Sequence, residues 1–159
     1  MYLEISPRQT GKTTRLINQL LHDIEYSEFE TFLVIACNSR MKQHLQDFLF
    51  ARLQNQKDII TISRNDHFVE LKNREFLSKY IGFSCKSDSD IFRGISSAEP
   101  KEYFDEFDFM KSVNYKPYNY YCTYGRMNRE SFELEVLGQF LDSGFQERNI
   151  ADVIIDDVS

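Results

Sequence analysis

The segment Ser6-Pro7-Arg8-Gln9-Thr10-Gly11-Lys12-Thr13 constrains the fold of this chain more than any other feature. It matches the phosphate-loop pattern G-x-x-x-x-G-K-[ST], except that Ser6 stands in place of the first glycine. Such a loop needs a strand before it and a helix after it, because helix N-terminal N–H groups must point at phosphate oxygens. Residues 2–5 read as a short strand, and residues 13–25 carry apolar side chains at helical spacing. The segment therefore lies where the pattern requires.

Each position in the loop has a physical role in holding ATP. Gly11 lets the backbone approach the phosphates closely, and Lys12 supplies a positive charge. Thr13 would place its hydroxyl on Mg²⁺, and Thr14 would hydrogen-bond an inner phosphate. The remaining loop residues predicted to contact the nucleotide are Arg8, Gln9 and Thr10.

Arg8 has two candidate tasks, because a planar guanidinium suits both stacking near the base and a catalytic contact with the γ-phosphate. A solvated arginine explains the residue equally well. The plain alternative for the whole motif is a Gly-Lys-Thr-Thr stretch that only begins a helix, with threonine as its cap. The strand before it and the amphipathic helix after it favour the phosphate loop.

The pattern along the chain predicts an α/β fold. An almost wholly apolar run at residues 31–36 is typical of a strand buried on both faces, and residues 40–53 follow with helical period, with Asn38 and Ser39 positioned to cap them. Residues 58–62 are predicted to form a third strand. Together with the phosphate loop, this β-α-β-α-β alternation predicts a three-layer α/β/α P-loop NTPase fold with a mostly parallel central sheet, in one domain spanning residues 1–159.

The second half of the sequence is less regular. We predict a helix over residues 67–80, then a loop over 82–100 with a short strand at 90–93. Strands are expected at 101–104, 118–123 and 152–155, and a helix at 131–141 that ends before Gly144.

Phosphoryl transfer to water needs a carboxylate near Mg²⁺ and a base for the attacking water. Asp105, directly after the strand at 101–104, is the predicted metal ligand, and Glu106 is the predicted general base. A rival pair, Asp156-Asp157, follows a more apolar strand but has no glutamate. Thr123, at the tip of another strand, is positioned to sense the γ-phosphate, and two later arginines are candidate arginine fingers: Arg126 and Arg129.

Composition narrows the setting. The formal net charge of -6 provides no global attraction to nucleic acid, so any contact with DNA must be local. Residues 1–4 lack a signal sequence, and no apolar run is long enough to cross a membrane. The cysteines Cys37, Cys85 and Cys122 are expected to be reduced, packed thiols. These features predict a cytoplasmic protein with no membrane partner.

The residues that surround the loop resemble a known family. Ser6 to Thr14, with serine for the first glycine and Arg-Gln inside the loop, is similar to the Walker A motif of viral DNA-packaging terminase large subunits. Residues 105–108 resemble their Walker B motif, and the strand ending at Thr123 occupies the place of their coupling motif. The resemblance implies a RecA-like ATPase that moves duplex DNA, usually as a ring, in the host cytoplasm. It fits a stand-alone phage relative of the ATPase half.

Three functions remain open. The first is a Mg²⁺-dependent ATPase that acts as a motor or remodeller on nucleic acid, with duplex DNA and further copies of the chain as candidate partners. The second is a catalytically weak nucleotide-binding protein that engages a protein partner. The third is a small-molecule kinase, which would need an arginine-rich lid, whereas residues 84–100 contain Arg93 alone.

Overall fold

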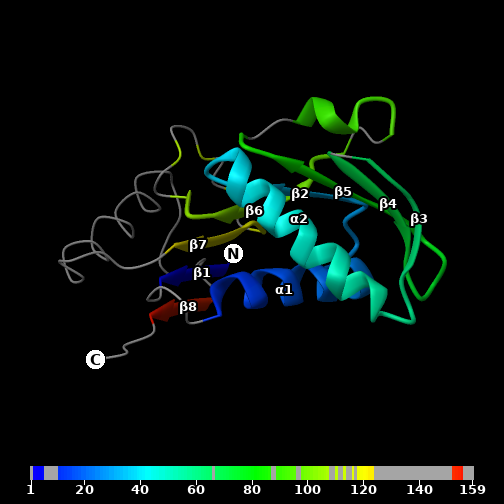
Figure 1. Ribbon diagram of the computed structural model, residues 1–159, viewed down its shortest axis with the longest axis horizontal. Helices are drawn as coiled ribbons and strands as arrows, with labels where there is room; N and C mark the ends of the chain where they lie inside the picture. The colour runs from blue at the N-terminus through cyan, green and yellow to red at the C-terminus, as the bar shows by residue number, and fades with distance from the viewer. Residues whose placement is uncertain are drawn as a thin grey trace.

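The computed structural model describes residues 2–5, 11–65, 67–86, 89–95, 98–107, 110, 113, 116, 118–123 and 152–155. Along the chain, β1 (Tyr2–Ile5) precedes α1 (Lys12–Tyr26), and β2 (Thr31–Ile35) precedes α2 (Ser39–Gln54). The following elements are β3 (Ile60–Arg64), β4 (Phe68–Lys72), β5 (Ser78–Ser84), the 3₁₀ helix η1 (Ser89–Phe92), β6 (Lys101–Asp105), β7 (Tyr120–Thr123) and β8 (Asp152–Ile155). Figure 1 shows these elements around one central sheet.

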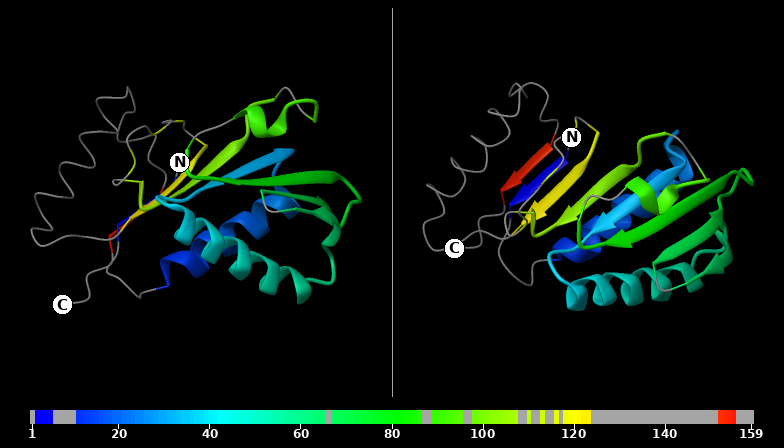
Figure 2. Two further views of the ribbon diagram at one scale, coloured as in Figure 1. Left: turned by 45° about the horizontal axis from the view of Figure 1, so that its top comes forward. Right: turned by 90° about the horizontal axis from the view of Figure 1, so that it is seen from above.

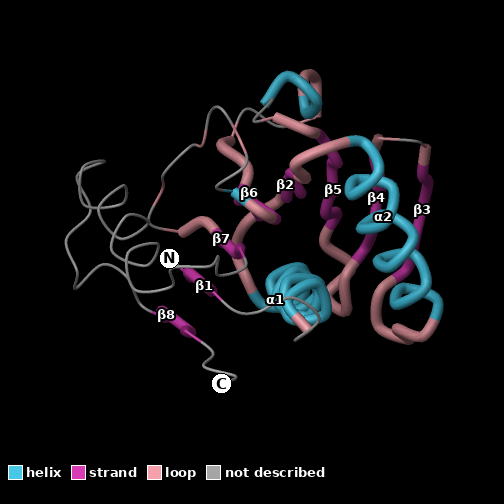
Figure 3. Tube along the Cα trace, turned by 60° about the vertical axis from the view of Figure 1, so that its left-hand side comes forward, coloured by secondary structure: helices cyan, strands magenta, loops and turns pink. Residues whose placement is uncertain are grey.

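The sheet has eight strands in the order β3-β4-β5-β2-β6-β7-β1-β8. Pairing is parallel from β5 through β2, β6, β7 and β1 to β8, whereas β4 is antiparallel to both β5 and β3. The α/β fold with a mostly parallel central sheet is therefore confirmed. The parallel strands all end at the same edge of the sheet, and Figure 3 shows their order with the phosphate-loop strand β1 near one side.

Both α-helices lie on the same face of the sheet, as Figure 2 shows. Apolar side chains of α1, such as Leu16 and Leu20, pack there against strand residues such as Val34 and Tyr103. Alternate residues of β2 point to opposite faces, and all five of its residues are buried. The apolar run that the sequence contains at this point is thus explained by burial on both faces.

A smaller cluster covers the opposite face. Leu33, Phe104 and Tyr121 pack there with Phe92 of η1 and with Phe107. Gly82 of β5 makes this contact possible, because a Cβ at this position would lie 3.0 Å from Ile91 Cδ1 and 3.2 Å from Phe92 Cζ. Within the described part of the chain, η1 and the residues around Phe107 form this layer; the helix predicted at 131–141 lies outside it.

A buried polar network attaches the end of α1 to β6. Asp23 Oδ2 accepts a hydrogen bond from the Tyr103 hydroxyl and forms an ion pair with Lys101 Nζ at 2.6 Å. Gln19 Nε2 donates to the other carboxylate oxygen at 3.0 Å. Burial, and then the charge of Asp23, raise the pKa of Tyr103 well above its ordinary value, so the phenol stays protonated and donates.

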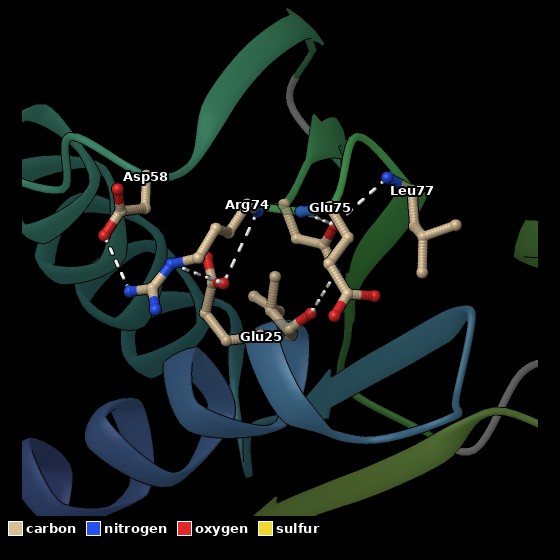
Figure 4. Close-up of polar contacts among 7 residues, drawn as sticks. Glu25, Asp58, Arg74, Glu75 and Leu77 are labelled. Carbon is tan, nitrogen blue, oxygen red and sulfur yellow. Dashed lines mark hydrogen bonds and ion pairs between the residues drawn. The ribbon is translucent and has the colours of Figure 1, made fainter.

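The turn between β4 and β5 docks on the same end of α1. Asn73 is buried, donates to the Ile24 carbonyl at 3.1 Å, and accepts from the Leu77 N–H at 3.0 Å. Next to it, Arg74 lies between the carboxylates of Asp58 and Glu25 (Figure 4). The side chain of Asn73 therefore replaces backbone partners and fixes a tight connection between the strands.

Two predictions about secondary structure are wrong, and so is the expected environment of one strand. Residues 67–80 form two strands of an antiparallel pair, β4 and β5, and not a helix, because Val69 and Leu71 alternate with half-buried residues at a period of two. The apolar run at 58–62 leads into β3, which is an exposed antiparallel edge strand and not a buried parallel one. Residues 90–93, predicted as a strand, fall largely in η1.

The other described elements match the sequence-based expectations. Asn38 is the N-cap of α2, and its side chain accepts from the Met41 N–H at 2.9 Å. The three cysteines are free, but the expectation of packed thiols is wrong for Cys85, which is exposed; Cys122 is buried and Cys37 is partly buried. In the part of the chain that the structure covers, no helix is long and apolar enough to span a bilayer.

Candidate functional site

The candidate site lies at the carboxyl edge of the parallel strands. β1 leads toward the phosphate loop, β6 ends at Asp105, and β7 ends at Thr123. β7 lies between the other two strands, with Thr123 paired to Ile5 and Cys122 paired to Asp105. Neighbouring strands of a sheet are about 4.8 Å apart, and only β7 separates β1 from β6. The end of β7 therefore lies between Ile5 and Asp105.

Gly11 forms the junction between the loop and α1. Its φ of 89° lies in the left-handed region, which side chains disfavour, and this explains glycine here. It is the N-cap of α1, and no side chain caps the helix. The plain alternative of a threonine cap is therefore not what the structure contains. Ser6 to Thr10, with the predicted contacts Arg8, Gln9 and Thr10, lie outside the described residues.

Lys12 and Glu106 meet at this edge. The Lys12 Nζ forms an ion pair with Glu106 Oε1, although 94 positions separate the two residues in the sequence. The Thr123 hydroxyl donates to the other carboxylate oxygen, Oε2, at 3.3 Å. Glu106 itself has a positive φ of 55°, an uncommon backbone conformation that directs the chain out of β6. Three residues predicted separately from the sequence thus form one contacting group.

Asp105 is almost fully buried beside this group. Its Oδ1 accepts a hydrogen bond from the Cys122 thiol at 3.5 Å, whereas Oδ2 is buried without a hydrogen-bond partner among the described residues. Burial, and then the charge of Glu106, raise the pKa of Asp105 to about 6, and the charge of Lys12 opposes this shift. A cation beside Oδ2 would stabilise the ionised form, so this carboxylate fits a Mg²⁺ ligand.

The remaining predicted ligands are placed less closely. Thr13 and Thr14 follow Lys12 in the first turn of α1, with Thr14 exposed and Thr13 partly buried. No group of three or more His, Cys, Asp or Glu residues forms a metal site in the described ranges. Mg²⁺ at a phosphate site commonly uses only one or two protein ligands together with phosphate oxygens and water, so Thr13 and Asp105 would suffice.

The rival acidic pair and the candidate arginine fingers stay predictions. Asp156-Asp157 and Arg126 and Arg129 lie outside the residues that the structure describes. β8, the strand before the rival pair, is paired with β1 on the side away from β7. Its position differs from that of β6, whose end brings Glu106 to Lys12.

Two contacts at the site were not predicted. Cys122 was expected only to pack, but its buried thiol, whose pKa burial raises well above the ordinary value, stays protonated and donates to Asp105. Glu4 of β1 forms an ion pair with Arg15 of α1. A charged residue inside the short apolar strand at 2–5 was the signal in the sequence, because such a charge needs a partner when it is buried.

No family model matches the sequence, and no curated protein does. Among solved structures, the large terminase from a thermophilic bacteriophage, in complex with ADP, aligns over 97% of this chain with a TM-score of 0.53 and 13% identity. Another structure of that terminase aligns over 98% with a TM-score of 0.58 and 11% identity. This chain shares the fold of these phage large terminase structures.

The similarity has clear bounds. The alignments cover 32% and 38% of the two terminase chains, so this chain spans about a third of their length. The Phi-28 gp11 DNA packaging motor aligns over 99% of this chain and 46% of its own, at 12% identity and a TM-score of 0.39 that is too low to support a statement about fold. At these identities the likeness concerns the fold, and the chemistry must be argued from the site.

Proposed function

We propose that this chain is a Mg²⁺-dependent ATPase of the terminase-like P-loop type that acts on nucleic acid. The observation that carries the proposal is the contact of Lys12 and Thr123 with one carboxylate, Glu106, at the edge where Gly11 turns into α1. A lysine for phosphate, a glutamate for water and a strand-tip hydroxyl are the groups that ATP hydrolysis needs. The buried Asp105 next to them would complete the set.

Each residue would have a defined task in that reaction. Lys12 would leave Glu106 for the more strongly charged phosphate oxygens, and Glu106 would then be free to accept a proton from the attacking water. The Thr123 hydroxyl would keep Oε2 of Glu106 in place when Lys12 has moved. Thr13 and Asp105 would hold Mg²⁺, which neutralises charge on the phosphates. Arg8 would serve as a further positive group within the loop.

The partner side of the proposal rests on the fold. The similarity to a phage terminase supports duplex DNA as the substrate and further copies of this chain as partners in an assembly. With a net charge of -6, contact with DNA must come from a local surface. Work on DNA would be visible as stimulation of ATP turnover by duplex DNA.

The test is ATP hydrolysis by the purified chain with Mg²⁺, with and without duplex DNA. Lys12→Ala should weaken ATP binding, and Glu106→Gln should bind ATP but lose turnover by about a hundredfold or more, as expected for loss of a general base. The matched control is Glu28→Gln, which removes the same charge from an exposed position and should leave turnover unchanged. Turnover that survives Glu106→Gln would rule out this base.

A second candidate function is a nucleotide-binding protein that engages a protein partner and hydrolyses little ATP. One observation favours it: every residue of the edge strand β3 is exposed, including Ile60 and Ile62. Exposed strand edges with apolar side chains are common sites of protein contact. Tight ATP binding without turnover, in the presence and absence of DNA, would support this function over the ATPase.

A further inference from the structure

Glu4 carries a charge in a place where strands are normally apolar. Its side chain is fully buried, and β1 is an interior strand, with Cys122 of β7 on one side and Ile154 of β8 on the other. Removing a carboxylate from water costs several kcal/mol in general, and a nearby cation returns only part of that cost. An apolar residue would serve the core at least as well, so packing alone does not explain Glu4.

The cation that pairs with Glu4 is Arg15, in the first turn of α1. Arg15 Nε forms the ion pair with Glu4 Oε1. The side chain of the same arginine also contacts Gly11: its Nη1 lies 3.1 Å from the place where a Cβ on Gly11 would stand. Its backbone N–H makes the first hydrogen bond of α1, to the Gly11 carbonyl at 2.9 Å. The guanidinium therefore packs against the residue at which α1 begins.

Two ion pairs thus extend from one turn of α1. Lys12 and Arg15 are three residues apart and lie on the same side of the helix. Lys12 reaches Glu106 after β6, and Arg15 reaches Glu4 in β1, with the end of β7 between them. Of the four side chains, Glu4 alone is fully buried, whereas Arg15 is 36% exposed and Lys12 and Glu106 are 9% and 13% exposed. Glu4, buried in an interior strand, therefore gives the Arg15 guanidinium a fixed partner.

We propose that Arg15, fixed by Glu4, is a positioning residue for the phosphate loop. It holds Gly11 and the first N–H groups of α1 at the height above β1 that the inner phosphates of a nucleotide require. This inference rests on the proposed function, because it gives the pair a task only if the loop binds a nucleotide. Its predicted signature is a loss of affinity that is equal for ADP and ATP, because the loop backbone cradles the inner phosphates that both contain.

The experiment compares Glu4→Gln and Arg15→Lys with Asp23→Asn. The Asp23 variant breaks another buried ion pair of α1, at the end far from the loop, and so controls for a purely structural cost. Dissociation constants for fluorescent ADP and ATP analogues are measured at a temperature where circular dichroism shows each variant to be fully folded. Arg15→Lys keeps the positive charge but loses the planar guanidinium, so it tests whether the geometry of the contact with Glu4 and Gly11 matters when the charge is retained.

We expect Glu4→Gln to weaken ADP and ATP by about tenfold each, the effect typical of losing a group that orients a ligand-binding residue. Arg15→Lys should give a smaller loss, and Asp23→Asn should leave both affinities within twofold of the wild type. If Glu4→Gln and Asp23→Asn have equal effects, the pair is structural and the inference is wrong, while the proposed function stands. If the wild type binds neither nucleotide, both fail.

Discussion

At the scale of single residues, the site buries charged side chains. Asp105, Glu4 and Lys12 are all buried, and each of the two carboxylates has one oxygen without a hydrogen-bond partner among the described residues. Such groups reduce the stability of the folded chain, and they persist at sites where a ligand will supply the missing interaction. Binding of a nucleotide with its metal should therefore stabilise the protein strongly.

The pKa of Asp105 gives a prediction for stability against pH. Because the folded pKa of Asp105, about 6, lies above the unfolded value of 3.8, the folded chain binds the proton more tightly, and the fold loses stability as the pH rises from 3.8 through about 6. Asp105→Asn should therefore be more stable than the wild type at pH 8, by on the order of 3 kcal/mol. The advantage should shrink below pH 6 and vanish near pH 4.

Urea unfolding of both proteins at several pH values without Mg²⁺ measures this difference. Glu28→Gln, at an exposed position, should show no comparable dependence on pH. An Asp105→Asn advantage that is constant from pH 4 to pH 8 would contradict the assignment of the titration to Asp105.

At the scale of elements, the turn between β4 and β5 depends on one side chain. Asn73 is buried and makes hydrogen bonds to α1 and within its own turn. Asn73→Ala would leave the Ile24 carbonyl without this donor and should lower the free energy of unfolding by about 2–3 kcal/mol. Arg74→Ala, next to it but exposed, should change stability little, because surface ion pairs contribute weakly.

Thermal or urea unfolding of the two variants provides the comparison. The turn is at the opposite end of α1 from the phosphate loop, so neither substitution should change affinity for ATP when the proteins are folded. Equal destabilisation by both would mean that the charges around Arg74, and not the amide of Asn73, fix the turn.

The elements that the sequence predicted well are those with one clear period. α1 and α2 have apolar residues at helical spacing, and β2 is a solid apolar run with both faces covered. Residues 67–80 misled because Phe68, Leu71, Leu77 and Tyr80 also fit helical spacing when the turn between them is overlooked. The turn depends on Asn73, whose side chain donates a hydrogen bond to the carbonyl of Ile24, 49 residues earlier in the sequence. The spacing of apolar residues cannot predict such a long-range contact.

Part of the site was also predictable, from the residues that lie at the ends of strands. Lys12, Asp105, Glu106 and Thr123 follow or precede recognisable strands, and parallel strands bring such residues to one edge. The Glu4–Arg15 pair was not predicted, because its two members lie in different elements and their contact depends on how α1 packs on β1. The sequence could indicate that Glu4 needs a partner, but not which cation provides it.

At the scale of the whole molecule, β3 leaves the sheet with an open edge. It pairs only with β4 among the described strands, and all of its residues are exposed. An exposed edge strand can pair with the strand of another chain, and Ile62 adds an apolar contact. We expect the wild type to associate reversibly at high concentration and Ile62→Lys to reduce that association without loss of stability.

Static light scattering over a range of concentrations tests this expectation. Phe76→Lys is the matched control, since it replaces an even more exposed apolar residue by the same charge away from the strand edge. A similar reduction by both variants would indicate that net charge, and not the edge of β3, controls association.

The contacts at the two ends of α1 have a mechanical consequence. The helix is tied to β1 near its start by Arg15 and Glu4, and to β6 at its end by Asp23 and Lys101. Since β7 lies between these strands, α1 is attached across all three of them. If β1 slid along β6, the Arg15–Glu4 or the Asp23–Lys101 ion pair would have to stretch. α1, about 22 Å long for its 15 residues, is thus held against the sheet at both of its ends.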